Sequence, residues 1–184
     1  MCIRDSAIPF SEEQGGLGGG HTDLSLIFEE FGKAIVVEPY LANVVLAGGV
    51  LKRSNLENAD ELIAGIVSGE TQISLANYEP MKGFNLDNID ATISSDGQIN
   101  GTKSTVLNAG NADHFLVFGK TGDGYAFGLV NRSSDGVKVV NYKTYDGFVS
   151  GDLVLENCKC DAVFSVENAL EILEETILDA IVCV

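Results

Sequence analysis

The residues that most often carry enzyme chemistry stand here in patterns that argue against hydrolytic and metal chemistry. Asp113 and His114 are adjacent, but a catalytic pair of this kind needs a nucleophile, and the sequence has no Gly-x-Ser-x-Gly elbow. Cys158 and Cys160 would place both sulfurs on one face of a strand, yet their spacing is not that of a zinc knuckle and no histidine lies nearby. We therefore expect reduced thiols and no metal site.

The glycine-rich segment 15–20 invites comparison with phosphate-binding loops. It does not match Gly-x-Gly-x-x-Gly, no predicted strand precedes it, and no Lys-Ser or Lys-Thr pair follows it. We interpret the segment as a flexible turn into a helix, with His21 exposed beside it.

Two stretches in a fixed order carry more information. They are Leu75-Ala-Asn-Tyr-Glu-Pro-Met-Lys-Gly-Phe-Asn85 and Asn100-Gly-Thr-Lys-Ser-Thr-Val-Leu-Asn-Ala-Gly110. Taken singly, the first reads as a strand end with a turn, and the second as an ordinary hairpin strand. Together they resemble the two flavin-facing stretches of the acyl-CoA dehydrogenase middle domain. The matching residues are Glu79, Pro80, Gly83, Asn100, Gly101, Lys103, Val106, Asn108 and Gly110.

Five positions depart from the family pattern. Tyr78 replaces Thr, Phe84 replaces Ser, Asn85 replaces Asp, Thr105 replaces an aromatic residue and Leu107 replaces a residue with a hydroxyl group. Each lost hydroxyl removes a hydrogen bond worth about 0.5–1.5 kcal/mol. Replacing a stacked aromatic ring forfeits a similar amount, about 0.5–1.5 kcal/mol. These changes weaken a tight cofactor complex without abolishing it, and Phe84 is the most disruptive because it is bulky.

The resemblance implies an enzyme that desaturates an acyl-CoA between Cα and Cβ, with FAD as the cofactor and hydride transfer to flavin N5. It assigns no catalytic residue to this chain, because the family's Glu base lies in a C-terminal helical domain outside the sequence. The substrate-facing position is Phe84. The cofactor-facing positions are Leu75, Asn77, Tyr78, Gly83, Phe84, Thr105, Val106 and Leu107.

The same resemblance implies three partners: the acyl-CoA substrate, electron-transfer flavoprotein, and further subunits in a homo- or hetero-oligomer. It is strongest toward the branch that includes the small subunit of pimeloyl-CoA dehydrogenase. Two alternatives stay open. The altered residues could mark a non-catalytic or flavin-poor partner subunit of a heteromeric acyl-CoA dehydrogenase, or the chain could be an unrelated β-sandwich binding module.

The elements that must position these stretches are helices followed by strands. Leu24, Ile27, Phe28 and Phe31 fall at i, i+3, i+4 and i+7, which predicts a helix with Thr22 or Asp23 as its N-cap. Pro39 fits the first turn of a second helix, and Gly69 is expected to end a third helix over residues 57–67.

Short alternating runs separated by Asp-Gly turns predict the β section. The predicted strands cover residues 71–77, 90–94, 98–107, 114–119, 125–131, 137–141 and 153–157. A final helix follows over residues 166–184. Its apolar side is Leu170, Leu173, Ile177 and Ile181, and its acidic side, expected to be solvated, is Glu171, Glu174, Glu175 and Asp179.

The predicted fold class is α+β of the acyl-CoA dehydrogenase kind, with an antiparallel β-barrel or sandwich in the middle. Residues 1–6 read as a translated sequencing adapter, and we expect them to be foreign to the fold. Residues 7–69 are expected to form part of an N-terminal helical domain, 70–164 the middle β domain, and 165–184 the start of a truncated C-terminal helical domain. The last helix has no stop signal, which indicates a fragment. Because the resemblance places the Glu base outside this sequence, we expect the fragment to be inactive by itself.

The charge balance excludes some partners. There are 27 acidic and 11 basic residues, giving a formal net charge of −16, whereas nucleic-acid and anionic-membrane surfaces need clustered Lys and Arg. The longest apolar run, around residues 41–51, is too short to span a bilayer. We expect a cytoplasmic protein that binds neither nucleic acid nor membrane.

Overall fold

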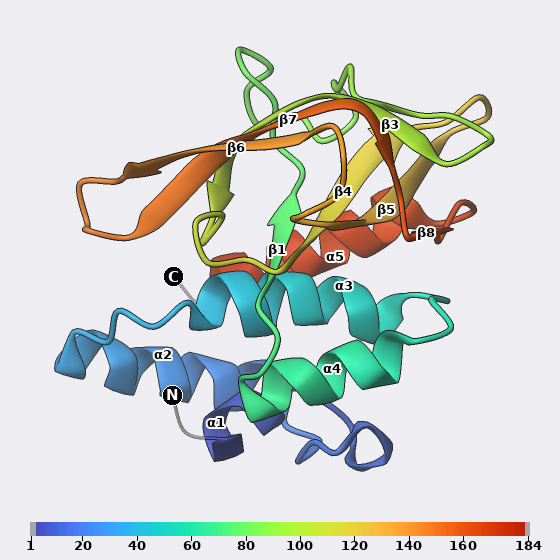
Figure 1. Cartoon of the computed structure of the whole chain (residues 1–184). Coiled ribbons are helices and arrows are strands. Elements are labelled where there is room, and N and C mark those ends of the chain that lie inside the picture. Colours follow the sequence, from blue (N-terminus) through green and yellow to red (C-terminus); the bar gives the residue numbers. More distant parts are fainter. Residues whose placement is uncertain (1–2, 183–184) are drawn as a thin grey trace.

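The computed structural model describes residues 3–182, which form a layer of helices beneath a mixed β-sheet (Figure 1). The helical elements are α1 (Ile3–Ala7), η1 (Glu12–Gln14), α2 (His21–Ala34), η2 (Leu41–Ala47), α3 (Gly48–Arg53), α4 (Ala59–Ser68) and α5 (Ala169–Val182). The strands are β1 (Ile73–Ala76), β2 (Thr92–Ile93), β3 (Gln98–Leu107), β4 (His114–Lys120), β5 (Tyr125–Asn131), β6 (Val137–Lys143), β7 (Val149–Lys159) and β8 (Ala162–Phe164).

Helix α2 carries the predicted apolar stripe, but its start differs from the prediction. Leu24 is buried, and Phe28 and Phe31 pack edge-on against the ring of Tyr40. The helix begins at His21 with Gly20 as N-cap, and the Asp23 carboxylate accepts a hydrogen bond from the Gly20 N–H at 2.8 Å. Thr22 and Asp23 are therefore inside the first turn, and the prediction that one of them is the N-cap is wrong.

The second and third helices form where Pro39 and Gly69 predict them. η2 continues directly into α3, and its hydrogen bonds have the wider π spacing before the α spacing begins at Gly48. Helix α4 ends at Gly69, whose φ of 80° is the left-handed conformation that a glycine adopts without strain. Gly49 lies where a side chain would come within 2.9 Å of Thr176, so its lack of one lets α5 approach α3.

The strands form one sheet in the order β6-β7-β3-β2-β4-β5-β8, with β1 paired to β4. Most neighbours are antiparallel, as predicted, but β1–β4 and β2–β4 are parallel, which the prediction of an antiparallel domain did not include. After β1 the chain runs through residues 77–91, which include most of the first stretch, and then forms β2 and β3 before it reaches β4. Because β2 and β3 lie between them in the sequence, β1 and β4 can pair as parallel strands.

All seven predicted strands are present, and β3 and β5 have the predicted bounds, whereas β1 and β2 are shorter than predicted. Strand β7 begins four residues before the predicted residue 153, at Val149, and the three-residue strand β8 is not among the predicted strands. The differences at β7 and β8 lie where the sequence lacks alternation. In the structure, these residues are strands because they pair with β6 and β5 respectively.

Two buried clusters hold the layers together. One joins the helices to one face of the sheet and includes Phe10, Ile63, Phe118, Phe127 and Leu173. The other lies against the opposite face, among residues of β2, β3, β4, β5 and β7, and includes Ile99, Phe115, Val117, Val130 and Leu153. Helices therefore cover the first face of the sheet, and the sheet curves around the cluster on its second face. The edges and loops of the sheet are left to form a site.

Helix α5 corrects the prediction for the end of the chain. It contacts η2, α3 and β5, and its buried face includes Ile172, Leu173 and Thr176. Asp179, expected to be solvated, has a side chain that is only 8% exposed. The apolar side, which we expect to pack on helices outside this sequence, is divided: Leu173 is buried within this chain, whereas Ile181 is 65% exposed. Asp179 faces inward because Lys52 and Arg53 of α3 lie opposite its carboxylate.

Part of the segment set aside as an adapter lies within the packed helical layer. Ile3–Ala7 forms α1, and the Asp5 carbonyl accepts a hydrogen bond from the Tyr40 hydroxyl at 2.7 Å. The origin of residues 1–6 and the proposed domain bounds stay predictions. None of the helices within residues 3–182 combines the length and apolar character that crossing a bilayer requires.

Candidate functional site

The two informative stretches meet at a buried ion pair. Lys103 on β3 places its Nζ 2.7 Å from Oε1 of Glu79, with side-chain exposures of 0% and 4%. The carboxylate also accepts hydrogen bonds from the backbone N–H groups of Asp90 at 2.6 Å and Ala91 at 2.9 Å. Glu79 thus joins the middle of the first stretch to the chain entering β2 and to Lys103 of the second stretch. We call Glu79, Lys103 and these two amides the Glu79 clasp.

Backbone hydrogen bonds extend the same junction. The Ser104 N–H donates to the Tyr78 carbonyl at 2.9 Å, and Lys103 Nζ donates to the Asn77 carbonyl at 3.4 Å. These bonds tie the chain that follows β1 to β3, although the two are not paired as strands. The residues predicted to face a flavin therefore come from two segments that the clasp fixes side by side.

The electrostatics of the clasp favour an ionised Glu79. Burial alone would raise its pKa, but the hydrogen bonds from Lys103 and the two amides outweigh burial, and the pKa of Glu79 is lowered. For Lys103 burial dominates and lowers the pKa, against the opposing effect of the Glu79 carboxylate. Hydrogen bonds outweigh burial for Glu79 but not for Lys103. The reason is that the carboxylate receives three donors, whereas the ammonium has one short acceptor and one long one.

A β-bulge shapes the second stretch. The register between β3 and β7 shifts between Lys103 and Val106, and Thr105 adopts a φ of 53°. The Asp152 carboxylate supports the bulge by accepting hydrogen bonds from the Thr105 N–H at 3.2 Å and the Tyr142 hydroxyl at 2.9 Å. The bulge leaves Thr105 exposed and Leu107 half-buried, while Val106 between them points into the core.

The first stretch continues into an exposed loop. The rings of Tyr78 and Phe84 meet edge to face, with centroids 5.8 Å apart and an interplanar angle of 89°. Phe84 is otherwise in solvent, with an exposure of 87%. Gly83 beside it has a φ of 68°, a left-handed conformation that suits glycine. The aromatic pair stands where the family pattern has Thr and Ser.

The eight predicted cofactor-facing residues divide into two groups. Leu75, Asn77 and Val106 are buried, so they would act through backbone groups or as support. The residues with accessible side chains or backbone are Tyr78, Gly83, Phe84, Thr105 and Leu107. The accessible group includes aromatic, apolar and hydroxyl surface and no charged side chain. Their roles toward a cofactor stay predictions.

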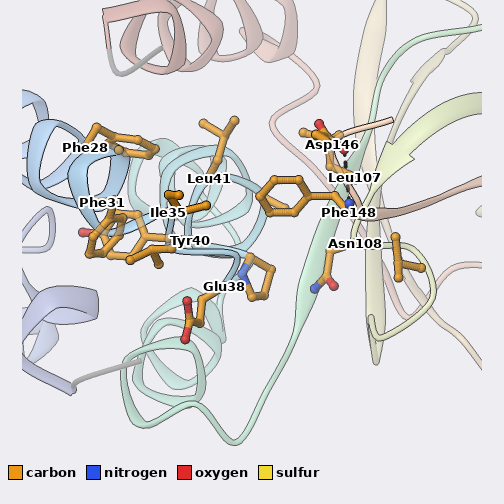
Figure 2. A pocket seen from close by; sticks show the side chains of 15 residues that line it. Phe28, Phe31, Ile35, Glu38, Tyr40, Leu41, Leu107, Asn108, Asp146 and Phe148 are labelled. Atoms are coloured by element: carbon orange, nitrogen blue, oxygen red, sulfur yellow. Dashed lines mark hydrogen bonds between the residues drawn. The ribbon is translucent and has the colours of Figure 1, made fainter. Parts of the chain in front are cut away.

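An apolar cavity of about 480 Å³ opens beside Leu107 (Figure 2). Figure 2 shows the Phe148 ring reaching from the β6–β7 hairpin toward Ile35 and Leu41 on the helical side. The lining residues are Phe28, Phe31, Gly32, Ile35, Val36, Glu38, Pro39, Tyr40, Leu41, Ala42, Leu107, Asn108, Asp146, Phe148 and Val149. The volume falls in the range of roughly 300–1,000 Å³ that is typical of small-molecule sites.

Sequence reasoning missed this cavity and the clasp. Of the predicted site residues only Leu107 lines the cavity. Its other walls come from residues 28–42, Asn108 and residues 146–149, which become neighbours only through folding. The clasp had a signal, because Glu79 and Lys103 are opposite charges that both match the family pattern. Their order and spacing support the resemblance, but the sequence alone does not indicate that the two side chains pair.

The remaining candidates from the sequence form no second site. The Asp113 carboxylate accepts a hydrogen bond from the Gln72 N–H at 2.8 Å, while Nδ1 of His114 is buried without a hydrogen-bond partner within residues 3–182. Cys158 and Cys160 are free thiols in the core, and burial raises the pKa of Cys160 to about 12. A thiol with so high a pKa is a poor nucleophile and metal ligand at neutral pH.

Comparison with known proteins gives sequence and fold relatives. No family model matches the chain. It is 32% identical over 148 residues to the acyl-CoA dehydrogenase FadE28 of Mycobacterium tuberculosis, a match that covers 80% of this chain and 42% of that protein. The chain thus spans less than half the length of this curated relative.

Two solved structures show the same fold. The ChsE4–ChsE5 complex from Mycobacterium tuberculosis matches with a TM-score of 0.79 and 27% identity, covering 91% of this chain and 47% of the matched chain. A glutaryl-CoA dehydrogenase from Mycobacterium smegmatis in complex with FADH2 matches with a TM-score of 0.87 and 19% identity, covering 97% and 50% respectively. The predicted fold class is therefore confirmed, over about half of each matched chain.

Proposed function

The chain resembles acyl-CoA dehydrogenases in sequence and in fold, and on that premise we propose that it is part of an FAD-dependent acyl-CoA dehydrogenase. The observation that carries the proposal is the junction of the two stretches by the Glu79 clasp, next to an apolar cavity that begins at Leu107. Leu107 would therefore belong both to the surface that binds the flavin ring and to the cavity that holds the acyl chain. That proximity is what a reaction between a flavin and an acyl chain requires.

The accessible residues fit a planar aromatic cofactor. Tyr78, Thr105 and Leu107 offer ring, methyl and aliphatic surface, and the clasp holds their backbone rigidly enough for a fixed hydrogen-bonding pattern. FAD, when bound, would accept the hydride from the substrate Cβ at N5. The chain's own residues would hold the ring, exclude water from one face of it and position the acyl chain in the cavity.

The proton-abstracting base is not assigned to this chain. Glu79 is committed to the clasp, and the Asp146 carboxylate accepts hydrogen bonds from its own turn, from the Thr144 hydroxyl and from the Phe148 N–H at 3.1 Å. The family resemblance places a Glu base in the C-terminal helical domain, and we adopt that assignment. The proposed partners are an acyl-CoA, electron-transfer flavoprotein and further subunits, in the cytoplasm.

An absorption experiment tests the proposal. The purified protein is titrated with FAD and then with heptanoyl-CoA while the visible flavin bands are recorded. Binding should perturb the bands, and the complete enzyme should bleach them on addition of the acyl-CoA. A protein that leaves the flavin spectrum unchanged at all concentrations, alone and with a partner chain, would overturn the proposal.

A second candidate is a flavin-poor partner subunit of a heteromeric enzyme. Phe84 is 87% exposed and pairs with Tyr78, so an aromatic wedge stands where the family has two small hydroxyl residues. One of the solved neighbours is a complex of two different chains, ChsE4 and ChsE5. The restoring variant Tyr78→Thr/Leu107→Thr separates the candidates. It should tighten FAD binding about tenfold if this chain holds the ring, since two hydrogen bonds are regained. It should change nothing if only the partner does.

A further inference from the structure

The cavity beside Leu107 has a one-sided charge pattern. Among its lining residues, all of which lie within the described part of the chain, the charged ones are Glu38 and Asp146, and none is Lys, Arg or His. Glu38 stands on the segment between α2 and η2, and Asp146 on the β6–β7 hairpin, so the two carboxylates come from opposite sides of the opening (Figure 2). Both residues are exposed and therefore belong to the rim.

The Asp146 carboxylate is fixed on this rim by its hydrogen bonds. The hydrogen bonds from the Thr144 hydroxyl and the Phe148 N–H lower the pKa of Asp146 and fix its carboxylate on the hairpin. The side chain of Asp146 is thus held in place next to the Phe148 ring that forms one wall. Glu38 is placed by its position directly before Pro39, whose ring restricts the local backbone.

The interior offers no cation that would compensate an anion. Phe28, Phe31, Leu41 and Phe148 are hydrocarbon, and the Tyr40 hydroxyl donates to the Asp5 carbonyl. The one lining side-chain amide, Asn108, donates one N–H to Gln72 and accepts from Asn111. A carboxylate that entered would lose its hydration and gain at most one neutral donor from this side chain in return.

We propose that this cavity selects acyl groups whose distal part is uncharged and apolar, and that Glu38 and Asp146 reject acyl groups ending in a carboxylate. The inference rests on the proposed function, because it takes the cavity as the acyl site. The proposal differs from what the resemblance to the small subunit of pimeloyl-CoA dehydrogenase implies, because pimeloyl is a dicarboxylic acyl group. The rim acts by repulsion, which is a recognised route to specificity.

Two acyl-CoA probes of equal carbon number test the proposal. Heptanoyl-CoA and pimeloyl-CoA differ at the distal end only, as a methyl group against a carboxylate. Their affinities for the purified protein are measured by isothermal titration calorimetry at low salt and again at 0.5 M NaCl. We expect heptanoyl-CoA to bind at least about fivefold more tightly, because each like charge near the carboxylate weakens binding. The ratio should shrink at high salt, since exposed charges are screened.

Variants assign the effect to the two residues. In Glu38→Gln/Asp146→Asn the amide oxygen at position 146 can still accept the turn hydrogen bonds, so the hairpin should keep its shape. The ratio between the probes should fall toward twofold. Asp135→Asn is the matched control, because Asp135 is an exposed turn acid that does not line the cavity. It should leave the ratio unchanged, and circular dichroism verifies that both variants fold.

The outcomes separate this inference from the proposed function. If neither probe binds the wild-type protein, the proposed acyl-CoA site fails and this inference fails with it. If both bind equally well, or if the double variant keeps the full ratio, the acyl-CoA site stands and the charge selection is overturned. Tighter binding of pimeloyl-CoA would overturn it most directly.

Discussion

Two carboxylates, those of Glu79 and Asp179, are almost fully buried in this protein and have different structural roles. The Glu79 side chain is 4% exposed and that of Asp179 is 8% exposed. Glu79 meets Lys103, which is fully buried, and two backbone amides within the sheet. Asp179 meets Arg53 at 2.7 Å, with His21 at 3.3 Å and Lys52 at 3.9 Å, where α5 docks on α2 and α3.

The two carboxylates differ in the solvent exposure of their basic partners. Lys103 has no exposed surface, whereas the Arg53 side chain is 20% exposed and that of His21 is 65% exposed. Loss of one partner in the clasp therefore strands a charge in the interior. Loss of one partner around Asp179 leaves cations that water can reach. The clasp fixes the local geometry of the candidate site, and the Asp179 cluster fixes the position of a helix.

Breaking the clasp from one side is expected to have the largest effect. Lys103→Met keeps most of the stem's volume but leaves the Glu79 carboxylate buried without its cation. The free energy of unfolding should fall by about 3–5 kcal/mol, which is the usual cost of an uncompensated buried charge. Urea denaturation followed by circular dichroism measures the loss.

The double variant Glu79→Gln/Lys103→Met distinguishes charge from packing. It removes both charges, and the Gln amide oxygen can still accept from one of the two backbone N–H groups, which bond different oxygens of Glu79. Most of the stability should return, because replacing a whole buried ion pair is often neutral. A single variant that costs less than about 1 kcal/mol, or a double variant as unstable as the single one, would contradict this account of the clasp.

Local patterns in the sequence predicted most of the fold. Strands β3 and β5 were predicted with their bounds because Asp-Gly turns and alternating residues are local signals. Gly69 ended α4 as predicted, since its left-handed φ is a backbone property of that residue. The resemblance to acyl-CoA dehydrogenases, drawn from two short motifs, is confirmed by a 32% identical relative.

Interactions between distant segments could not be read in the same way. Asp179 was placed on a solvated face because helix patterning does not show that Arg53, far away in the sequence, faces it. Strand β8 has three residues, too few to show a period, and exists through its pairing with β5. The cavity walls, from residues 28–42 and 107–149, likewise meet only in the folded chain.

Weakening the Asp179 cluster should have an intermediate effect. Asp179→Asn preserves the side-chain shape but removes the charge opposite Arg53. We expect a loss of about 1.5–3 kcal/mol in unfolding free energy, the range for hydrogen bonds to charged groups. Hydrogen exchange should also quicken in α5 before the sheet responds, because the cluster holds that helix to the others.

Glu175→Gln is the matched control for that variant. Glu175 also contacts Arg53, at 3.0 Å, but its side chain is 55% exposed. An exposed pair contributes at most about 1 kcal/mol, so this variant should be close to wild type. Equal losses from the two variants would show that burial of the carboxylate does not set the size of the effect.

The smallest expected effect is the acid sensitivity of the clasp. The folded-state pKa of Glu79 is lowered from its ordinary value of 4.5, so the unfolded chain binds this proton more readily. The stability that Glu79 contributes is therefore fully present above pH 4.5 and is lost as the pH falls through the folded-state pKa. The loss is modest because burial of Glu79, which by itself raises the pKa, offsets much of the effect of its donors on that pKa. Urea midpoints between pH 5 and pH 2 should fall more steeply for the wild type than for Glu79→Gln/Lys103→Met. The double variant still shows some acid sensitivity, because the exposed carboxylates of Asp90, Asp96 and Asp146 titrate in both proteins. Parallel acid limbs in the two proteins would mean that the donors around Glu79 do not favour its ionised form, and the contrast with Asp179 would then rest on burial alone.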